Sequence, residues 1–248
     1  MNFQKRKQKI LEKLNIDGEV DIKQIAVELN ISEITIRRDL NRLAGDGLLY
    51  RTHGGAMKVD PLEIPHDFVN KTAKNVAAKD KICRAAADQI NHGDIIFMDC
   101  GSTVFRLCQF IKNKKIKVIT NSIPVVYELQ NSLVSLNIIG GEFDAERQAV
   151  HGKIANEHIA NYRANKAFLG VDGISRNGLF ANSELEADIT QAFAANSAKT
   201  YLLCDDSKIG KESYFKFAQL KMVNTLITNS RSVELVDYKK QGLEVIEV

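Results

Sequence analysis

Apolar residues recur every three or four positions over the first 45 residues, a spacing that predicts short amphipathic helices. The segment Ile10–Leu14 lies in the first helix, Asp21 caps the second, and Ser32 caps a third that runs to about Ala44. The apolar stripes of these helices are Ile10, Leu11 and Leu14; Ile22, Ile25, Ala26 and Leu29; and Ile36, Leu40 and Leu43. Residues 48–52 are strand-like and a turn follows at 53–55, so the pattern predicts a small helical unit that ends in a hairpin.

The pattern changes at about residue 79, where apolar runs begin to alternate with helix-like stretches. The runs lie at 95–98, 117–120, 134–139, 167–171, 200–204 and 225–228, and the helix-like stretches at 79–90, 105–111, 124–130, 154–162 and 184–196. Continuous apolar strands separated by helices are typical of a parallel sheet covered on both faces. We therefore predict a first domain over 1–57, a linker over 58–77, and a doubly wound, mostly parallel α/β domain over 78–248.

Composition narrows the class of protein only slightly. The 248 residues hold 34 Lys and Arg against 31 Asp and Glu, a net charge of +3, so bulk charge does not indicate a nucleic-acid binder. The four cysteines show no CxxC spacing and no nearby histidine pair, so we expect no zinc or other metal site, and nothing indicates a cofactor. No apolar run approaches the ~20 residues that span a bilayer, and no secretory leader is evident. We expect a cytoplasmic protein with reduced thiols and no membrane partner.

The outward side of the third predicted helix carries side chains suited to DNA. Two helices joined by a tight turn, with another helix before them, fit a helix-turn-helix, whose second helix enters the major groove. Arginine can pair with guanine or hold phosphate, asparagine can pair with adenine, and the hairpin would be a wing against the DNA. The candidate DNA-binding residues are Ser32, Thr35, Arg37, Arg38, Asn41, Arg42, Arg51 and His53. A helical module that docks a protein partner fits the same spacing.

The segment TIRRDL at 35–40, followed by RTHGGA at 51–56, resembles the signature of the DeoR family of bacterial transcriptional regulators. The likeness covers nearly all of residues 5–57 and implies a winged helix-turn-helix that binds operator DNA. It implies that Ser32, Thr35, Arg37 and Arg38 lie nearest to DNA, and that Asp39 is structural, in a pair with an arginine or with the wing. Operators are usually read by symmetric assemblies, so we expect a homo-oligomer.

Polar and glycine-containing loops follow several strands of the second predicted domain. The loop 99–103 joins a buried strand to a helix, where backbone N–H groups, two hydroxyls and a helix N-terminus could hold a phosphate; an ordinary capped turn fits equally well. Ligands of open parallel sheets bind outside the carboxyl ends of the strands. There Lys208 could pair with a phosphate, and Asp172 and Glu186 could accept hydrogen bonds from sugar hydroxyls. The candidate effector-binding residues are Asp99, Gly101, Ser102, Thr103, Thr120, Asn121, Gly141, Asp172, Glu186 and Lys208, and Cys100 is either a thiol at the site or a small filler.

Residues 78–235 also resemble the DeoR-type sensor domain, which is similar to ribose-5-phosphate isomerase. The likeness rests on Gly-Ser-Thr at 101–103 and Asp-x-Ser-Lys at 205–208, and it implies a phosphorylated sugar as effector. The catalytic loops of the isomerase are not matched: its first loop aspartate falls at Leu169, Gly173 replaces the glutamate of that loop, and no lysine and glycine cluster precedes Glu186. Isomerisation requires proton transfer and charge stabilisation, so we expect a binding domain without catalytic residues.

Together these features predict a DNA-binding transcriptional regulator, a repressor of a sugar-metabolism operon. Its partners would be double-stranded operator DNA, a phosphorylated sugar effector and further copies of the chain. The effector would have to bind one of two conformations more tightly than the other in order to change the affinity for DNA. The alternative is a sugar-phosphate isomerase with a DNA-binding appendage.

Overall fold

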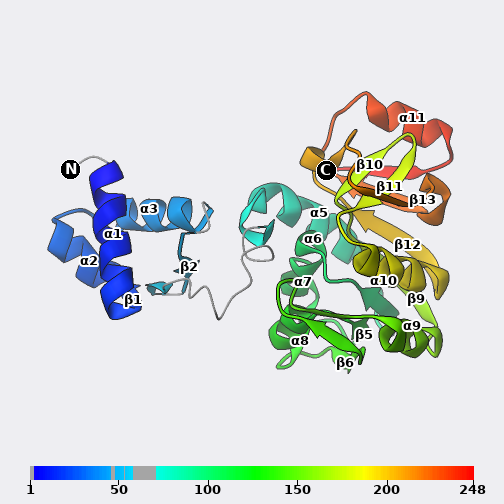
Figure 1. Cartoon of the computed structure of the whole chain (residues 1–248), viewed down its shortest axis with the longest axis horizontal. Coiled ribbons are helices and arrows are strands. Elements are labelled where there is room, and N and C mark those ends of the chain that lie inside the picture. Colours follow the sequence, from blue (N-terminus) through cyan, green and yellow to red (C-terminus); the bar gives the residue numbers. More distant parts are fainter. Residues whose placement is uncertain (1–2, 46–47, 53, 58–70) are drawn as a thin grey trace. The chain divides into compact units, whose positions relative to one another are not determined.

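The computed structural model describes residues 3–45, 48–52, 54–57 and 71–248, which form two compact units, Met1–Lys74 and Asn75–Val248 (Figure 1). The first unit contains α1 (Phe3–Asp17), β1 (Glu19–Asp21), α2 (Ile22–Leu29), α3 (Glu33–Gly45), β2 (Tyr50–Arg51) and β3 (Gly55–Met57). Its strands form an antiparallel sheet in the order β1-β3-β2. The three predicted helices and the hairpin are therefore confirmed, and β1 is an element that the pattern did not predict.

Local sequence explains the ends of these helices. The Asp21 carboxylate caps α2, because its Oδ1 accepts hydrogen bonds from the backbone N–H of Lys23 at 2.8 Å and of Gln24 at 3.1 Å. Asn30 ends α2 in the left-handed conformation, with φ 52°. A Cβ atom at Gly55 would lie 1.8 Å from the Val20 carbonyl oxygen, so the pairing of β1 with β3 requires glycine there. The apolar stripes meet in one core that includes Ile10, Leu14, Ile22, Ile25, Ile36, Leu40 and Leu43.

The second unit is built on strands alternating with helices. The first half contains α5 (Val76–Asp88), β4 (Ile95–Met98), α6 (Ser102–Phe105), α7 (Cys108–Ile111), β5 (Lys117–Thr120), α8 (Ile123–Leu129), β6 (Ser135–Ile138), β7 (Glu142–Asp144), β8 (Ala149–His151) and α9 (Lys153–Ala160). The second half contains β9 (Ala164–Leu169), β10 (Gly173–Ser175), β11 (Gly178–Ala181), α10 (Glu184–Ala195), β12 (Ser197–Leu203), η1 (Asp206–Lys208), β13 (Phe215–Ala218), η2 (Leu220–Met222), β14 (Thr225–Thr228), α11 (Glu234–Lys240) and β15 (Glu244–Glu247).

Seven of these strands form one sheet in the order β15-β14-β12-β9-β4-β5-β6, and every neighbouring pair is parallel. The chain runs outward from β4 to β6, returns to β9 beside β4, and continues outward on the other side. The strand order therefore reverses between β4 and β9. In open α/β sheets, ligands bind outside the carboxyl ends of strands at such a reversal. The predicted doubly wound α/β fold is confirmed, and this edge is where such a fold would bind a ligand.

The two faces of the sheet are buried against different helices (Figure 1). Ile96 and Met98 of β4 pack in the core formed with α5 to α8, whereas Phe97 packs in the core formed with α9, α10 and α11. The Phe97 ring stacks on Phe193 of α10, with centroids 4.6 Å apart. This alternation along a strand that is apolar throughout explains the unbroken hydrophobic runs of the sequence.

Some predicted elements differ in the structure. In place of the helix predicted over 105–111, the structure has two four-residue helices, α6 and α7. The helix that begins at the 99–103 loop is therefore shorter than expected, and fewer aligned peptide dipoles point at that loop. The small antiparallel pairings β7-β8 and β10-β11-β13 were not predicted. Residues 58–70 of the predicted linker lie outside the described residues, while 71–73 are helical and α5 begins at Val76. No helix of the described residues is both long and apolar enough to traverse a bilayer.

Candidate functional site

The outward stripe of α3 is the first candidate surface. Ile34, Arg38 and Asn41 are exposed at spacings of four and three residues, opposite the buried side chains of Ile36 and Leu40. Arg38 makes no hydrogen bond or ion pair with any other described residue. Its guanidinium can therefore bind an external group without first losing a partner among the described residues.

The other two arginines of α3 are held by the protein. Arg37 forms an exposed ion pair with Glu33, with 3.6 Å between Nη2 and Oε2. The Arg42 guanidinium lies over the Phe3 ring of α1, 4.2 Å from its centroid. The structure thus divides the predicted basic face: Arg38 lies on the outward stripe, and Arg37 and Arg42 flank it with partners of their own.

Asp39 has the structural role expected for it. Its side chain is buried and receives two hydrogen bonds from the Arg6 guanidinium of α1, at 2.5 Å from Nε and 3.0 Å from Nη2. This bidentate pair joins α1 to α3 and fixes the direction in which the outward stripe points.

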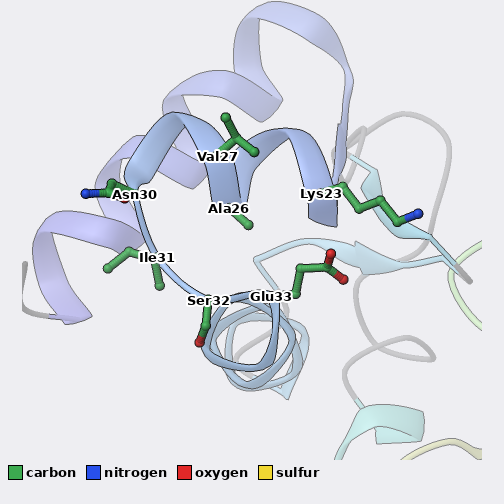
Figure 2. A pocket seen from close by; sticks show the side chains of 7 residues that line it. All are labelled: Lys23, Ala26, Val27, Asn30, Ile31, Ser32 and Glu33. Atoms are coloured by element: carbon green, nitrogen blue, oxygen red, sulfur yellow. The ribbon is translucent and has the colours of Figure 1, made fainter.

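The N-terminus of α3 is organised by Ser32 and Thr35. The two hydroxyl oxygens lie 3.0 Å apart, and Ser32 Oγ accepts a hydrogen bond from the Thr35 N–H at 3.4 Å. A shallow hollow opens beside this turn, between α2 and the start of α3 (Figure 2). It is lined by Lys23, Ala26, Val27, Asn30, Ile31, Ser32 and Glu33. In the wing, His53 and the side chain of Arg51 lie outside the described residues.

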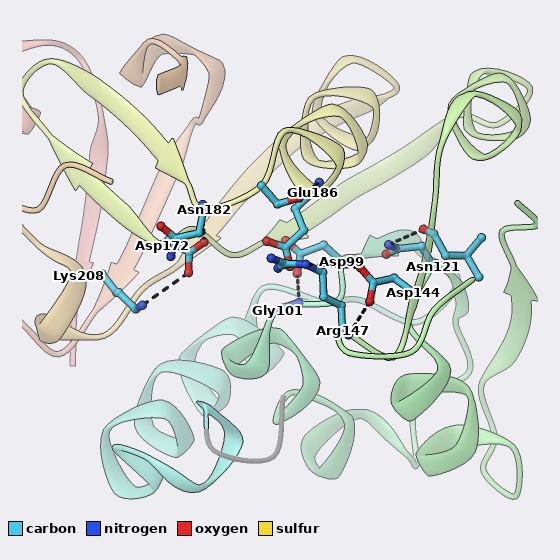
Figure 3. Close-up of polar contacts among 11 residues, drawn as sticks. Asp99, Gly101, Asn121, Asp144, Arg147, Asp172, Asn182, Glu186 and Lys208 are labelled. Atoms are coloured by element: carbon cyan, nitrogen blue, oxygen red, sulfur yellow. Dashed lines mark hydrogen bonds and ion pairs between the residues drawn. The ribbon is translucent and has the colours of Figure 1, made fainter. Parts of the chain in front are cut away.

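In the second unit, Asp99 joins the two loops at the strand-order reversal. It follows β4, it is 4% exposed, and its carboxylate accepts hydrogen bonds from Gly101 N–H at 2.8 Å and from Gly170 N–H at 2.5 Å (Figure 3). A Cβ atom at Gly101 would lie 2.9 Å from Asp99 Oδ1, so the close approach of the loops requires glycine. Gly101 therefore leaves room for the Asp99 carboxylate, and its N–H already donates a hydrogen bond to that carboxylate.

The charge state of Asp99 is sensitive to its surroundings. Burial raises the pKa of its carboxyl to about 7, while the N–H donors of Gly170 and Gly101 act in the opposite direction. The nearby carboxylates of Glu186 and Asp172 raise that pKa further. Three predicted site carboxyls are thus close enough to influence one another.

Lys79 is a candidate site residue that the sequence analysis missed. It lies on α5, it is 4% exposed, and its Nζ donates a hydrogen bond to Ser102 Oγ at 3.1 Å. Burial lowers the pKa of Lys79 to about 8, and Asp205 partly offsets this effect. The sequence does contain a signal, because Lys79 occupies the apolar stripe of α5 together with Ile82, Cys83 and Ala86. A buried lysine directed at the 99–103 loop supplies the positive charge that a phosphate would require.

Lys208 and Asp172 meet on the opposite side of this edge. Lys208 Nζ lies 3.8 Å from Asp172 Oδ1, and Asp172 Oδ2 accepts the Asn182 N–H at 2.9 Å (Figure 3). The loop that carries Lys208 is fixed by the buried Asp205, whose Oδ1 accepts the Ser207 N–H at 3.0 Å. The predicted Asp-x-Ser-Lys stretch is thus an ordered turn with its lysine directed at a predicted site carboxylate.

A third polar group is formed by Arg147 and Glu186. Arg147 follows β7, pairs with Glu186 of α10, and lies 3.6 Å from Asp144 Oδ2 through its Nε (Figure 3). Arg147 is the second residue that the sequence analysis missed, because it lies in an irregular turn without a motif. Cys100 lies near Arg147 and Glu186. Burial raises the pKa of its thiol, and the charges of Glu186 and Asp99 raise that pKa further, so the thiol stays neutral.

Four other predicted residues are engaged within the fold. Thr120 is fully buried, and its hydroxyl donates to the Met98 carbonyl at 2.7 Å and accepts the Ser122 N–H at 3.1 Å. Asn121 Nδ2 donates to the Val150 carbonyl at 3.0 Å. Gly141 has φ 151° and packs against the carbonyl of His151. Thr103 is buried, and its carbonyl accepts a hydrogen bond from the Cys83 thiol at 3.1 Å. Within the described residues, no group of three or more His, Cys, Asp or Glu side chains could hold a metal ion.

Comparison with known proteins supplies matches over both units. The profile of the DeoR-like helix-turn-helix domain matches residues 6–61, and that of the DeoR C terminal sensor domain matches residues 74–230. A lactose phosphotransferase system repressor from Lactococcus lactis subsp. lactis is 37% identical over 238 residues, covering 93% of this chain and 92% of the relative. A repressor of the same name from Staphylococcus aureus is 31% identical over 253 residues, covering all of both chains.

Solved structures resemble this chain more distantly. Ribose 5-phosphate isomerase A from Methanocaldococcus jannaschii aligns with a TM-score of 0.41 at 17% identity, over 55% of each chain. Translation initiation factor eIF-2B from Pyrococcus horikoshii aligns with a TM-score of 0.47 at 16% identity, over 90% of this chain and 86% of the other. At such identities the likeness concerns the fold alone.

Proposed function

Since the chain belongs to the DeoR family of DNA-binding transcriptional regulators, we propose that it represses a sugar-metabolism operon and that a phosphorylated sugar bound by the second unit controls its affinity for operator DNA. The named relatives, which are repressors of a lactose phosphotransferase system, match over nearly the whole chain and support the repressor assignment. Because these relatives are named for a phosphotransferase system, we propose that the regulated genes serve the uptake or use of a sugar that is phosphorylated by such a system.

We assign operator contact to the outward side of α3. Arg38 and Asn41 would meet base edges or phosphates, and Ser32 and Thr35 would contact the backbone from the start of the helix. Arg37 and Arg42 would contribute weakly at the margins, because Glu33 and Phe3 already hold their guanidinium groups. A symmetric operator would be bound by a homo-oligomer, with one α3 in each half-site.

The observation that supports the effector site most strongly is the buried Lys79 directed at Ser102. A phosphate in the 99–103 loop could accept a charge-assisted hydrogen bond from the Lys79 ammonium, which already lies within hydrogen-bond distance of that loop. Lys208 could approach the same phosphate if it left Asp172, from which it is 3.8 Å distant. We therefore propose that the effector phosphate is held by Lys79, Ser102, Thr103 and Lys208.

The hydroxyl groups of the effector would meet the carboxylates on the same edge. Asp172 and Glu186 are each in ion pairs, with Lys208 and Arg147. A sugar hydroxyl can donate to a carboxylate and accept from an arginine, so a polyol can enter between such partners and preserve the hydrogen bonding of both. Asp99 would contribute mainly by holding in place the two loops that its carboxylate joins.

We propose that this site binds its ligand without transforming it. In an isomerase, a carboxylate base must be available to remove a proton from carbon, whereas Glu186 is paired with Arg147. The enzyme alternative is tested by incubating the protein with ribose 5-phosphate: turnover that Glu186→Gln abolishes would support an isomerase, and absence of turnover with intact phosphate binding would support a sensor.

The decisive experiment is a gel-shift titration of the full-length protein on duplex DNA from upstream of its own gene. A panel of pentose and hexose phosphates is added, each matched with its free sugar. The proposal expects a specific shift that one sugar phosphate abolishes and its free sugar does not. A specific shift that no sugar phosphate changes would contradict the effector assignment while leaving DNA binding in place.

A further inference from the structure

Ile34 is a large apolar side chain in an unusual place. It is 73% exposed, and it lies in the first turn of α3, in line with Arg38 and Asn41 on the outward stripe. The neighbouring apolar residue of the same helix, Ile36, is fully buried, so α3 has no shortage of apolar contact with its own core. Isolated exposed apolar residues are common on protein surfaces, but this one occupies the face that meets DNA.

The position of Ile34 limits what it can contact. In helix-turn-helix proteins, residues near the N-terminus of the second helix reach base edges in the major groove. The Ile34 side chain has no donor or acceptor, so it cannot bind phosphate or recognise guanine or adenine by hydrogen bonds. The base-pair edges in the major groove present one large apolar group, the C5-methyl of thymine.

We infer that Ile34 is a specificity-determining residue that recognises a thymine methyl group in each operator half-site. Ile34 and Arg38 are four residues apart, which corresponds to about 6 Å along the helix. Successive base pairs are about 3.4 Å apart, so the thymine should lie within about two base pairs of the position contacted by Arg38. The inference depends on DNA binding through α3 and is independent of the effector.

The experiment replaces thymine by uracil, which lacks only the methyl group. A binding duplex is first obtained by selection from a pool of randomised duplexes with the full-length protein. Each thymine of that duplex is then replaced in turn by deoxyuridine, and dissociation constants are measured at one salt concentration. Four proteins are compared: the unmodified chain, Ile34→Ala, Ile34→Val, and Val27→Ala as the matched control. Val27 is 81% exposed but belongs to α2, away from the stripe.

For the unmodified chain, we expect replacement of one thymine in each half-site to weaken binding about fourfold, the effect of removing one buried methyl group. That sensitivity should vanish in Ile34→Ala and persist in Ile34→Val and Val27→Ala. Because Ile34 is exposed, thermal unfolding should be unchanged in both Ile34 variants.

Two results would overturn the inference. One is a uracil profile that is the same in Ile34→Ala as in the unmodified chain at every thymine. The other is a sensitive thymine whose response disappears in Val27→Ala and persists in Ile34→Ala, which would assign the contact to α2.

Discussion

The outward stripe of α3 and the sheet edge at the strand-order reversal are both candidate binding surfaces, and they are prepared for ligands in opposite ways. On α3, Arg38 is exposed and has no partner among the described residues. At the sheet edge, charged groups are buried or half-buried and already paired with one another, as in Lys208 with Asp172 and Arg147 with Glu186.

The difference has a thermodynamic consequence. A ligand of Arg38 adds interactions, whereas a ligand of the edge must exchange interactions that the folded chain already has. Substitutions on the stripe should therefore change affinity and leave stability alone, while substitutions at the edge should change both. An exchange of partners is also what a sensor requires, because only an effector that binds two arrangements unequally can shift the balance between them.

The largest effect is expected for Asp99→Ala. The half-buried N–H groups of Gly101 and Gly170 would lose their acceptor, at a total cost of about 2–4 kcal/mol of unfolding free energy. Urea unfolding followed by circular dichroism measures this loss. If Asp99→Ala unfolded at the same urea concentration as the unmodified chain, the hydrogen bonds of Asp99 with Gly101 and Gly170 would not stabilise the sheet edge.

The pH dependence of stability gives a second measurement on Asp99. Its folded-state pKa of about 7 lies above the ordinary value of 3.8, so between these values the folded state holds a proton that the unfolded chain has lost. The stabilising contribution is therefore complete below about pH 4 and is lost as the pH rises through 7. Asp99→Asn should show a smaller fall in unfolding free energy between pH 5 and pH 8 than the unmodified chain.

The next largest effect is expected for Lys79→Met, which separates binding from stability. Loss of a charged hydrogen bond to phosphate should weaken effector binding by about tenfold or more. Burial holds the pKa of Lys79 at about 8, so the ammonium is costly to the fold at neutral pH and Met should leave stability equal or higher. Calorimetric titration with the effector and thermal unfolding measure the two quantities.

The same lysine predicts how effector affinity depends on pH. Affinity of the unmodified chain should fall as the pH rises through about 8, because Lys79 then loses its proton. Lys79→Arg, which stays charged, should remove this fall. An affinity that is constant from pH 7 to pH 9.5 in the unmodified chain would exclude Lys79 from the phosphate site.

The two surfaces also differ in how far the sequence reveals them. β4, β5 and β14 have the bounds predicted for them, because buried apolar residues follow one another in each strand instead of alternating with exposed polar ones. The short strands β7 and β10 escape prediction, since three residues carry too little periodicity to indicate a strand.

The site residues also divide into those that a local sequence pattern reveals and those that only the folded structure brings together. Arg38 belongs to a helix face and a motif, both visible in the sequence. The partner of Lys79 is Ser102, 23 positions away, and that proximity exists only after α5 packs on the sheet. Thr120 illustrates the ambiguity of such patterns, because a polar residue at the end of a strand is as useful to a βα turn, where the structure has its hydroxyl engaged, as to a ligand.

On the stripe, Arg38→Ala should weaken operator binding about 5- to 100-fold, the range for a lost bidentate contact. Thermal unfolding should be unchanged, because Arg38 has no protein partner among the described residues. Fluorescence anisotropy with the selected duplex measures affinity, and Arg38→Lys distinguishes a base contact from a phosphate contact, since only the latter tolerates lysine. Full operator affinity in Arg38→Ala would remove this residue from the interface.

The smallest effect is expected for Arg42→Ala. The guanidinium lies over the Phe3 ring, a contact that contributes about 0.5–1 kcal/mol at exposed sites. Truncation should lower stability by that amount and change operator affinity little, the reverse of Arg38→Ala. Phe3→Ala completes the test, because it removes the ring and leaves Arg42 available. If Arg42→Ala weakened binding as much as Arg38→Ala, and Phe3→Ala strengthened it, Arg42 would leave Phe3 in order to bind DNA. The surface of α3 would then exchange partners on binding, as the sheet edge does.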